Sequence, residues 1–444
     1  MDIRYRIQGG IPLMGDVTIS GSKNAALPLL AGSVVCSGVS VFHNVPRLSD
    51  IETMISILKF LGAKVSFIDN TVTVDATKLN NQPIPHDLVS KLRGSIVLLG
   101  PLLARFGRVE MAYPGGCVLG KRPVNAHIQA FVQMGAKDLC TDNTLCLEGT
   151  LSAREIVLPE FSVTATENVI LAAALVEGET TVELAAAEPH VQDVCDFLAS
   201  RGITIIGRGT HTITVRGKKK IGGGQHTVIS DYLEAGAFVI AGLVTRGHVR
   251  IHGVERSHLL SFLNACERMG GKCRFDGSGV LHVHGNESSL KALRVQTNIF
   301  PGFPTDLQAP FGVAMTQAQG VSRIFEVLFE GRMAYLYELE KMGAHIEILN
   351  SHQALVIGPT PLQGRMVASN DIRAGAAMVL AGLCAHGETI VTDVKYIERG
   401  YDQLVPKLQA LGARITRQQE ISAIVEAPLK AKVSKETAKV KSRK

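Results

Sequence analysis

The sequence lacks several features that would place it in a specialised class of protein. None of its eight cysteines stands in a C-x-x-C pair, which argues against a zinc ribbon and against a thioredoxin-like redox site. No apolar run is long enough to cross a bilayer, and the first residues, MDIRYRIQGG, contain no apolar core of a signal peptide. We therefore expect a cytoplasmic protein whose cysteines are mostly reduced and buried.

Net charge is also scarce outside the C-terminal end. The formal charge of the chain is +6, and residues 430–444 alone hold seven Lys/Arg and one Glu, which is also +6. A nucleic-acid-binding domain would carry its basic patch on folded structure, so nucleic acid is not an expected partner. We expect residues 419–444 to form a basic, disordered tail. The other residues are numerous and apolar enough for two or three globular domains.

One short pattern recurs six times along the chain. It reads LGAKVSF at 61, MGAKDLC at 134, RGITIIG at 201, MGGKCRF at 269, MGAHIEI at 342 and LGARITR at 411. The first glycines of the copies are 67 to 73 residues apart, at Gly62, Gly135, Gly202, Gly270, Gly343 and Gly412. A second set of glycines precedes them by 23 to 28 residues, at Gly38, Gly107, Gly178, Gly247, Gly320 and Gly387. The chain is therefore built from six related units.

Each unit predicts an apolar helix, a β-rich run, an amphipathic helix and further strands. The first helix is apolar nearly all round, so we expect it inside a domain with the sheets outside, and both sets of glycines fit helix C-caps. Units this long favour closed domains of three units over an open solenoid. We predict one domain at 22–229 and another formed by 1–21 plus 230–418, with the N-terminal strand IRYRIQG returning to it and one cleft between the two.

Basic residues open three of the apolar helices. Lys23, Arg93 and Arg373 oppose the positive end of the helix dipole, which suggests that an anion binds there. Ser162 and Asp231 open two other apolar helices, and capping of backbone N–H groups is enough to explain them.

A glycine-rich stretch, PGGCVLGKRPV, indicates a loop at residues 112–123 that carries Cys117. Lys121 and Arg122 would tune its thiol, and the alternative is an incidental thiol without a role.

Five motifs, spread in order over about 418 residues, then carry a family resemblance: SGSKNAALPLL, NVPRLSDI, PGGCVLGKRPV, FPTDLQA and IERGY. The chain resembles the enolpyruvyl transferase family, and within it the UDP-N-acetylglucosamine 1-carboxyvinyltransferases. The resemblance implies an α/β fold of two inside-out barrels, as in 5-enolpyruvylshikimate-3-phosphate synthase. It also implies transfer of the enolpyruvyl group of phosphoenolpyruvate to the 3'-hydroxyl of UDP-N-acetylglucosamine, with release of phosphate and no cofactor or metal, as the first committed step of peptidoglycan synthesis.

The resemblance also implies roles for individual residues. Lys23, Arg122 and Arg399 would hold phosphoenolpyruvate, with Asn24 beside them. Cys117 would donate a proton to C3 and form a covalent adduct, and Asp306 would take the proton of the sugar hydroxyl. The nucleotide sugar would contact the remaining members of the site, which are Arg93, Arg122, Pro123, Val124, Asn125, Ala126, Glu160, Ser162, Val163, Glu188, Asp231, Leu328, Arg332, Asp371 and Arg373.

Three positions depart from the family pattern, and three rivals stay open. Asn125 stands where Asp is common, Glu160 where Lys is common, and His190 where Glu often follows Glu188-Pro189. The first rival is 3-phosphoshikimate 1-carboxyvinyltransferase, which lacks the cysteine loop. The second, an RNA 3'-terminal phosphate cyclase, needs a histidine motif that we do not find. The third is a non-catalytic protein that binds nucleotide sugar, which would keep the anion-binding arginines without needing both Cys117 and Asp306. The sequence leaves the oligomeric state open.

Overall fold

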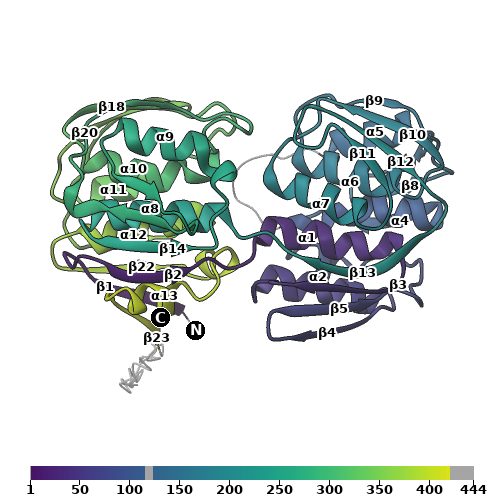
Figure 1. Cartoon of the computed structure of the whole chain (residues 1–444), viewed down its shortest axis with the longest axis horizontal. Helices are drawn as coiled ribbons and strands as arrows, with labels where there is room; N and C mark the ends of the chain where they lie inside the picture. The colour runs from purple at the N-terminus through teal and green to yellow at the C-terminus, as the bar shows by residue number, and fades with distance from the viewer. Residues whose placement is uncertain (1, 116–123, 421–444) are drawn as a thin grey trace, which may run out of the picture.

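The computed structural model describes residues 2–115 and 124–420. Figure 1 shows two lobes side by side, and the N-terminal strands lie in the same lobe as the C-terminal half of the chain. Each lobe has its own apolar core. In what we call the first lobe, the core residues lie between Ala25 and Val228. In the second lobe, the core joins residues 5–19 to residues 232–415.

The first helix of each repeat lies inside its lobe, as the apolar sequences predicted. Every residue of the helices at Tyr232–Val244 and Gln308–Thr316 is buried. Short 3-10 helices, η2 (Arg93–Leu98) and η5 (Thr305–Leu307), lead into the second and fifth of these helices. In chain order the six inner helices are α1 (Lys23–Gly32), α4 (Leu99–Phe106), α6 (Val163–Ala173), α8 (Tyr232–Val244), α10 (Gln308–Thr316) and α12 (Ile372–Cys384).

The second helix of each repeat keeps an exposed or partly exposed face, in agreement with its amphipathic sequence. In chain order these helices are α2 (Ser49–Phe60), α5 (Asn125–Gln133), α7 (Pro189–Ala199), α9 (Leu260–Arg268), α11 (Tyr335–Lys341) and α13 (Leu404–Ala410). The described residues also form the short helices α3 (His86–Val89), η1 (Ser33–Val35), η3 (Arg256–Leu259), η4 (Gly285–Glu287) and η6 (Ile397–Arg399).

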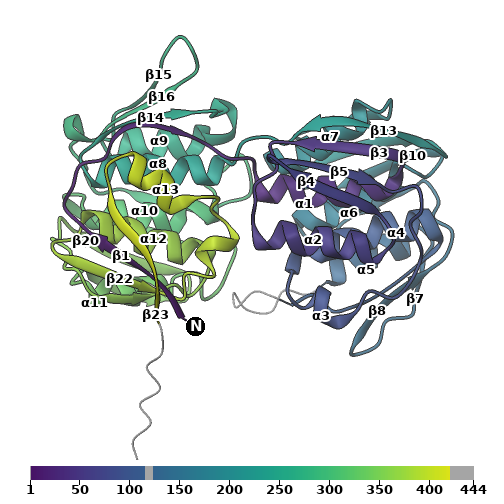
Figure 2. The same ribbon diagram turned by 90° about the horizontal axis from the view of Figure 1, so that it is seen from below.

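Separate small sheets cover the helices, so the predicted arrangement with helices inside and sheets outside is confirmed (Figures 1 and 2). The sheets of the first lobe are, in strand order, β13 (Ile221–Thr227), β3 (Cys36–His43), β5 (Thr71–Asp75), β4 (Lys64–Ile68); β6 (Arg108–Ala112), β8 (Thr144–Glu148), β7 (Lys137–Asp138); and β11 (Thr204–Ile206), β12 (Thr212–Gly217), β10 (Gly178–Glu183), β9 (Glu155–Val157). Those of the second lobe are β15 (Cys273–Phe275), β16 (Leu281–His284), β14 (His248–His252), β2 (Met14–Thr18); β17 (Arg294–Gln296), β18 (Gly320–Phe325), β20 (Gln353–Gly358), β19 (His345–Asn350); and β21 (Met366–Ala368), β22 (Glu388–Thr392), β1 (Asp2–Gln8), β23 (Arg414–Glu420).

The N-terminal strand completes the sheet of the sixth repeat. In the other repeats the last strand pairs antiparallel with both earlier strands, as β5 does with β3 and β4. The sixth repeat supplies only β22 and β23 for this arrangement, and β1 lies antiparallel between them. Residues 2–8 and 414–420 are therefore hydrogen-bonded to each other in one sheet of the second lobe. Of the predicted tail at 419–444, the first two residues belong to β23, and residues 421–444 lie outside the described residues.

The two sets of phased glycines have different structural roles. All six glycines of the first set, such as Gly62 after α2, adopt a positive φ, and they follow the second helix of each repeat as predicted for C-caps. The C-cap prediction is wrong for most of the second set. Only Gly107 caps a helix directly, whereas Gly178 and Gly320 open strands in the left-handed conformation. Gly247 has no positive φ, but an added Cβ would lie 2.0 Å from the carbonyl oxygen of Leu13.

A search of the described residues finds no helix with the length and apolar character needed to span a membrane.

Candidate active site

A cavity of about 730 Å³ lies where the two lobes meet. The helix starts line it: Lys23 and Asn24 at α1, Arg93 at η2, Ser162 at the start of α6, and Asp306 in η5. Helix starts concentrate unpaired N–H groups and positive dipole ends, so this cavity suits negatively charged ligands.

Asp50 joins two of the expected cations across the cavity. Its Oδ2 lies 3.0 Å from Nζ of Lys23, and its Oδ1 lies 2.8 Å from Nε of Arg399. Asp50 is in the first turn of α2 and its side chain is 6% exposed, while Arg399 ends η6 in the other lobe. The three groups carry a net charge of +1, which favours binding of an anion beside them. Asp50 was not recognised from the sequence, although it stands in the motif NVPRLSDI.

Asp306 is held between two buried arginines. Its Oδ1 lies 2.5 Å from Nη2 of Arg332, and its Oδ2 lies 3.0 Å from Nε of Arg373. Burial by itself would raise the pKa of Asp306, but the two guanidinium groups outweigh burial and hold the pKa well below its usual range. The carboxylate is therefore ionised and able to accept a proton, but it is a weak base in this arrangement.

Four titratable side chains that line the cavity near α6 and α7 have pKa values shifted toward the neutral form. Burial raises the pKa of Glu167 well above its ordinary value, with nearby Glu188 as a smaller cause, and burial also raises the pKa of Glu188. Burial lowers the pKa of His127 and of His190 to about 4. His127 Nε2 lies 2.9 Å from Oγ1 of Thr164. The sequence offered no signal for Glu167 or His127, because both stand inside predicted helices without a motif.

The starts of the buried helices show how their polar residues are used. Lys23 is the first residue of α1 and Arg93 of η2, and Arg373 is the second residue of α12. Lys23 and Arg373 pair with carboxylates of the protein, those of Asp50 and Asp306. Ser162, Asp231 and Asp371 accept hydrogen bonds from backbone N–H groups of the helices they cap, so the capping interpretation of Ser162 and Asp231 is confirmed.

The structure brings many, but not all, of the predicted site residues together. Those that line the cavity are Lys23, Asn24, Arg93, Glu160, Ser162, Val163, Glu188, Asp306, Leu328, Arg332 and Arg399, and His190, one of the three departures from the family pattern, lines it too. Six other predicted residues do not line the cavity. They are Val124, Asn125 and Ala126 at the start of α5, Asp231 at the start of α8, and Asp371 and Arg373 at the start of α12. Cys117, Arg122 and Pro123 lie outside the described residues.

Curated proteins with similar sequences share one activity by name. The chain is 41% identical over 418 residues to the UDP-N-acetylglucosamine 1-carboxyvinyltransferase of Methylacidiphilum infernorum, covering 93% of this chain and 98% of that protein. It is 42% identical over 417 residues to the enzyme of the same name from Vibrio atlanticus, with 93% and 98% covered. A Staphylococcus saprophyticus relative, numbered 2 in its name, is 41% identical over 420 residues, with 93% and 99% covered.

Solved structures and a family model agree with this result. The enolpyruvyl transferase NikO from Streptomyces tendae superimposes with a TM-score of 0.85 at 25% identity, covering 94% of this chain and 99% of that one. EPSP synthase from Acinetobacter baumannii gives a TM-score of 0.74 at 18% identity, with 94% and 100% covered, and so shares the fold. The family model described as EPSP synthase (3-phosphoshikimate 1-carboxyvinyltransferase) matches residues 7–433. The chain therefore belongs to the EPSP synthase family and, within it, to the UDP-N-acetylglucosamine 1-carboxyvinyltransferases.

Proposed function

We propose that this chain transfers the enolpyruvyl group of phosphoenolpyruvate to the 3'-hydroxyl of UDP-N-acetylglucosamine and releases phosphate, the first committed step of peptidoglycan synthesis. The observation that carries the proposal is the cavity between the lobes, in which Lys23, Asp50 and Arg399 form one group and Asp306 another. The names of the relatives support the choice of acceptor. The cytoplasmic location of the reaction stays a prediction.

Phosphoenolpyruvate would bind at the group formed by Lys23, Asp50 and Arg399. Both cations belong to helix starts or short helices that line the cavity, and Asp50 holds them in place through different oxygens. Their net charge of +1 attracts an anion, and a guanidinium binds phosphate or carboxylate through paired N–H groups. Arg122 and Asn24 would add further contacts, as the resemblance implies.

Asp306 would act as the base, and its two arginines would control when it does so. Removal of a hydroxyl proton needs a stronger base than a carboxylate paired with two guanidinium groups. Arg332 lines the cavity, so the diphosphate of the nucleotide sugar would draw this guanidinium away from Asp306. The pKa of Asp306 would then rise, and the base would become active only when the acceptor is bound.

Cys117 would supply the proton at C3 of phosphoenolpyruvate, on the side opposite the base. This role rests on the resemblance of the loop PGGCVLGKRPV. Glu160, Ser162, Val163 and Leu328 would lie along the nucleotide. The predicted residues outside the cavity lining, which are Val124, Asn125, Ala126, Asp231, Asp371 and Arg373, would complete the closed site. We further propose that the lobes are the two domains predicted at 22–229 and at 1–21 plus 230–418, and that the nucleotide sugar closes them.

Phosphate release tests the proposal directly. Purified wild-type enzyme, Cys117→Ser and the control Cys140→Ser would be assayed with phosphoenolpyruvate and either UDP-N-acetylglucosamine or shikimate 3-phosphate. Cys140 is a partly exposed thiol that does not line the cavity. We expect release only with the nucleotide sugar, a sharp loss in Cys117→Ser and none in Cys140→Ser. Release with shikimate 3-phosphate would assign the chain to the rival activity, and no release with either acceptor would favour a non-catalytic binding protein.

A pH profile tests the control of Asp306. The limb of kcat/KM that reports the base should move to higher pH in Arg332→Gln, because one of the two groups that lower the pKa of Asp306 is gone. An unchanged limb would contradict a role of Arg332 in tuning the base.

A further inference from the structure

Three histidines share the outer face of the sheet that contains β14 and β16. Side chains alternate along both strands, so Val249, Ile251, Leu281 and Val283 are buried under the sheet while the histidines are partly exposed on the other side. His248 lies directly opposite His284 in the antiparallel register, and His282 is two residues along the same face. The two alternate histidines of LHVH and the pairing of His284 with His248 therefore place three imidazoles together.

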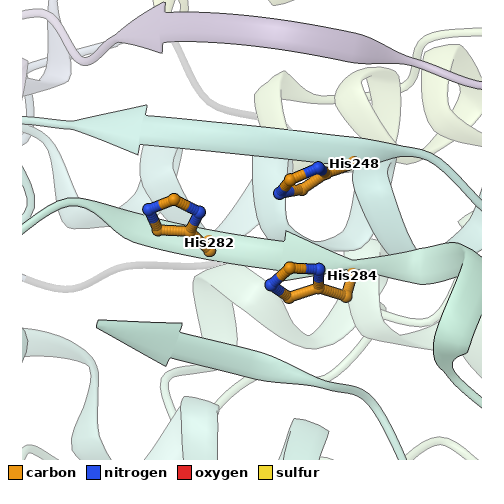
Figure 3. A group of neighbouring side chains, drawn as sticks. All are labelled: His248, His282 and His284. Atoms are coloured by element: carbon orange, nitrogen blue, oxygen red, sulfur yellow. The ribbon is translucent and has the colours of Figure 1, made fainter. Parts of the chain in front are cut away.

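The three rings are close enough to share one ligand. His248 and His284 stack with ring centroids 4.4 Å apart, and His282 lies 5.8 Å from the first ring and 6.1 Å from the second. One ring nitrogen from each histidine lies within 4.8 Å of the other two. Figure 3 shows that the three rings turn nitrogens toward a common space between them.

A carboxylate lies behind each of two rings, and one of these carboxylates is within hydrogen-bonding distance. Nε2 of His282 lies 3.0 Å from Oδ2 of Asp276, which leaves Nδ1 facing the common space. Nδ1 of His284 lies 3.7 Å from Oε1 of Glu287, which is too long for a hydrogen bond, and its Nε2 faces the common space. A carboxylate behind the outer nitrogen of an imidazole is the usual support of a histidine that binds a metal.

The third nitrogen has no partner of its own. Nε2 of His248 is buried and makes no hydrogen bond within residues 2–115 and 124–420. A buried polar atom without a partner is unfavourable, and a metal ion would satisfy it. This atom is the one that Figure 3 shows directed at the other two rings.

We propose that His248, His282 and His284 bind one divalent transition-metal ion, of which Zn²⁺ is the representative, with water completing the coordination. Three neutral imidazoles suit Zn²⁺, Ni²⁺ or Cu²⁺, whereas Mg²⁺ and Ca²⁺ prefer oxygen ligands. Tetrahedral Zn²⁺ with Zn–N bonds of about 2.0 Å needs nitrogens roughly 3.3 Å apart. Small rotations of the partly exposed side chains would close the remaining distance.

The surroundings carry charges of both signs. Arg250 and Arg274 lie opposite His282 on the neighbouring strands and work against a cation. Arg250 is paired with Asp16, and Asp276 and Glu287 stand beside the rings, so the local charge is offset. None of the three histidines lines the cavity between the lobes. The ion would therefore tie β14 to β16 and stabilise the second lobe without entering the reaction.

Calorimetric titration tests this proposal, with ZnCl₂ as the probe and MgCl₂ as the comparison. The full chain is used without a histidine tag, after a chelator has removed bound metal. The variants are His248→Ala, His282→Ala and His284→Ala. His252→Ala is the matched control, because His252 lies on the same face of β14 but outside the group. Circular dichroism of the metal-free proteins shows that each variant is folded, and phosphate release shows that the reaction is intact.

We expect one Zn²⁺ per chain for wild type and His252→Ala, no binding of Mg²⁺, and affinity lower by more than about tenfold in each of the three variants, since changes behind a ligand alone cost ~10–100-fold. Zn²⁺ at roughly a hundredfold excess over Kd should raise the melting temperature of the wild type by roughly 5–11 °C. Co²⁺ should give a visible spectrum without a thiolate charge-transfer band. Equal Zn²⁺ binding in all variants, no binding by the wild type, or a thiolate band that assigns the ion to a cysteine such as Cys273 would overturn the proposal.

Discussion

Replacing Asp50 by Asn tests how the two lobes share charge at the cavity. The substitution keeps the size of the side chain and removes the carboxylate that pairs with Lys23 and Arg399. The side chains of these two cations are only 9% and 19% exposed, so little water is available to replace the lost partner. Breaking a buried ion pair from one side costs about 3 kcal/mol, which corresponds to a fall in melting temperature of roughly 6–12 °C for a lobe of this size.

The same substitution should make the protein more responsive to anions. With Asp50 neutral, the net charge of the group rises from +1 to +2, and inorganic phosphate would compensate it. Differential scanning fluorimetry with and without phosphate or phosphoenolpyruvate measures both effects. We expect a lower melting temperature for Asp50→Asn without anions and a larger rise on adding phosphate than for wild type. Turnover should fall, because Lys23 and Arg399 lose the group that positions them.

Glu52→Gln is the matched control. Glu52 is in the same first turn of α2 and pairs with Arg47, but both side chains are about half exposed, at 50% and 52%. Exposed ion pairs contribute little, so the melting temperature and its response to phosphate should stay close to wild type. If Asp50→Asn behaves like Glu52→Gln in both measurements, the argument that Asp50 holds two buried cations is refuted.

Three further predictions concern pH, the loop cysteine and motion of the lobes. Burial raises the pKa of Glu234 from 4.5 to about 7 despite its ion pair with Lys407, so the folded state holds this proton more tightly than the unfolded state. The stabilisation from this proton is full below pH 4.5 and is lost as pH rises through 7. The free energy of unfolding measured with urea should therefore decline over this range in wild type but not in Glu234→Gln. Equal pH profiles for the two proteins would contradict the assignment. Fosfomycin, an epoxide that alkylates the family's loop cysteine, should inactivate wild type and Cys140→Ser. Mass spectrometry should detect no drug adduct on Cys117→Ser. Full activity of wild type after incubation with excess drug would count against the role of Cys117. Small-angle scattering should show compaction on adding UDP-N-acetylglucosamine, and an unchanged radius of gyration would argue against closure of the lobes.

The repeat and its buried helices could be predicted from the sequence because their signals are local. A helix such as α8 is apolar on nearly every side, with Glu234 as the exception, and this is visible in thirteen consecutive residues. The left-handed glycines after the second helices are equally local, since only the backbone of that turn requires them. The second set of glycines was misassigned because a left-handed residue can open a strand as well as end a helix, and the sequence around Gly178 or Gly320 does not distinguish the two.

The candidate site was predictable residue by residue where the family resemblance or a cation at a helix start, such as Arg93, marked it. Lys23, Asp306 and Arg399 stand in family motifs, and all three line the cavity. Glu167 and His127 do not, and their altered pKa values come from burial by segments that are distant in the sequence.

The sequence by itself determined the sixfold repeat, the inner and outer helices and the chemical types available to the site, because periodicity and helix capping act over a few residues. Only the tertiary structure decided which charges meet. Asp50 and Arg399 are 349 positions apart, and Asp306 and Arg373 are 67 apart, yet each pair is in direct contact. The same holds for the three histidines, whose shared face follows from the register of β14 and β16. Electrostatic interactions depend on distance in space and on burial, and folding alone sets both.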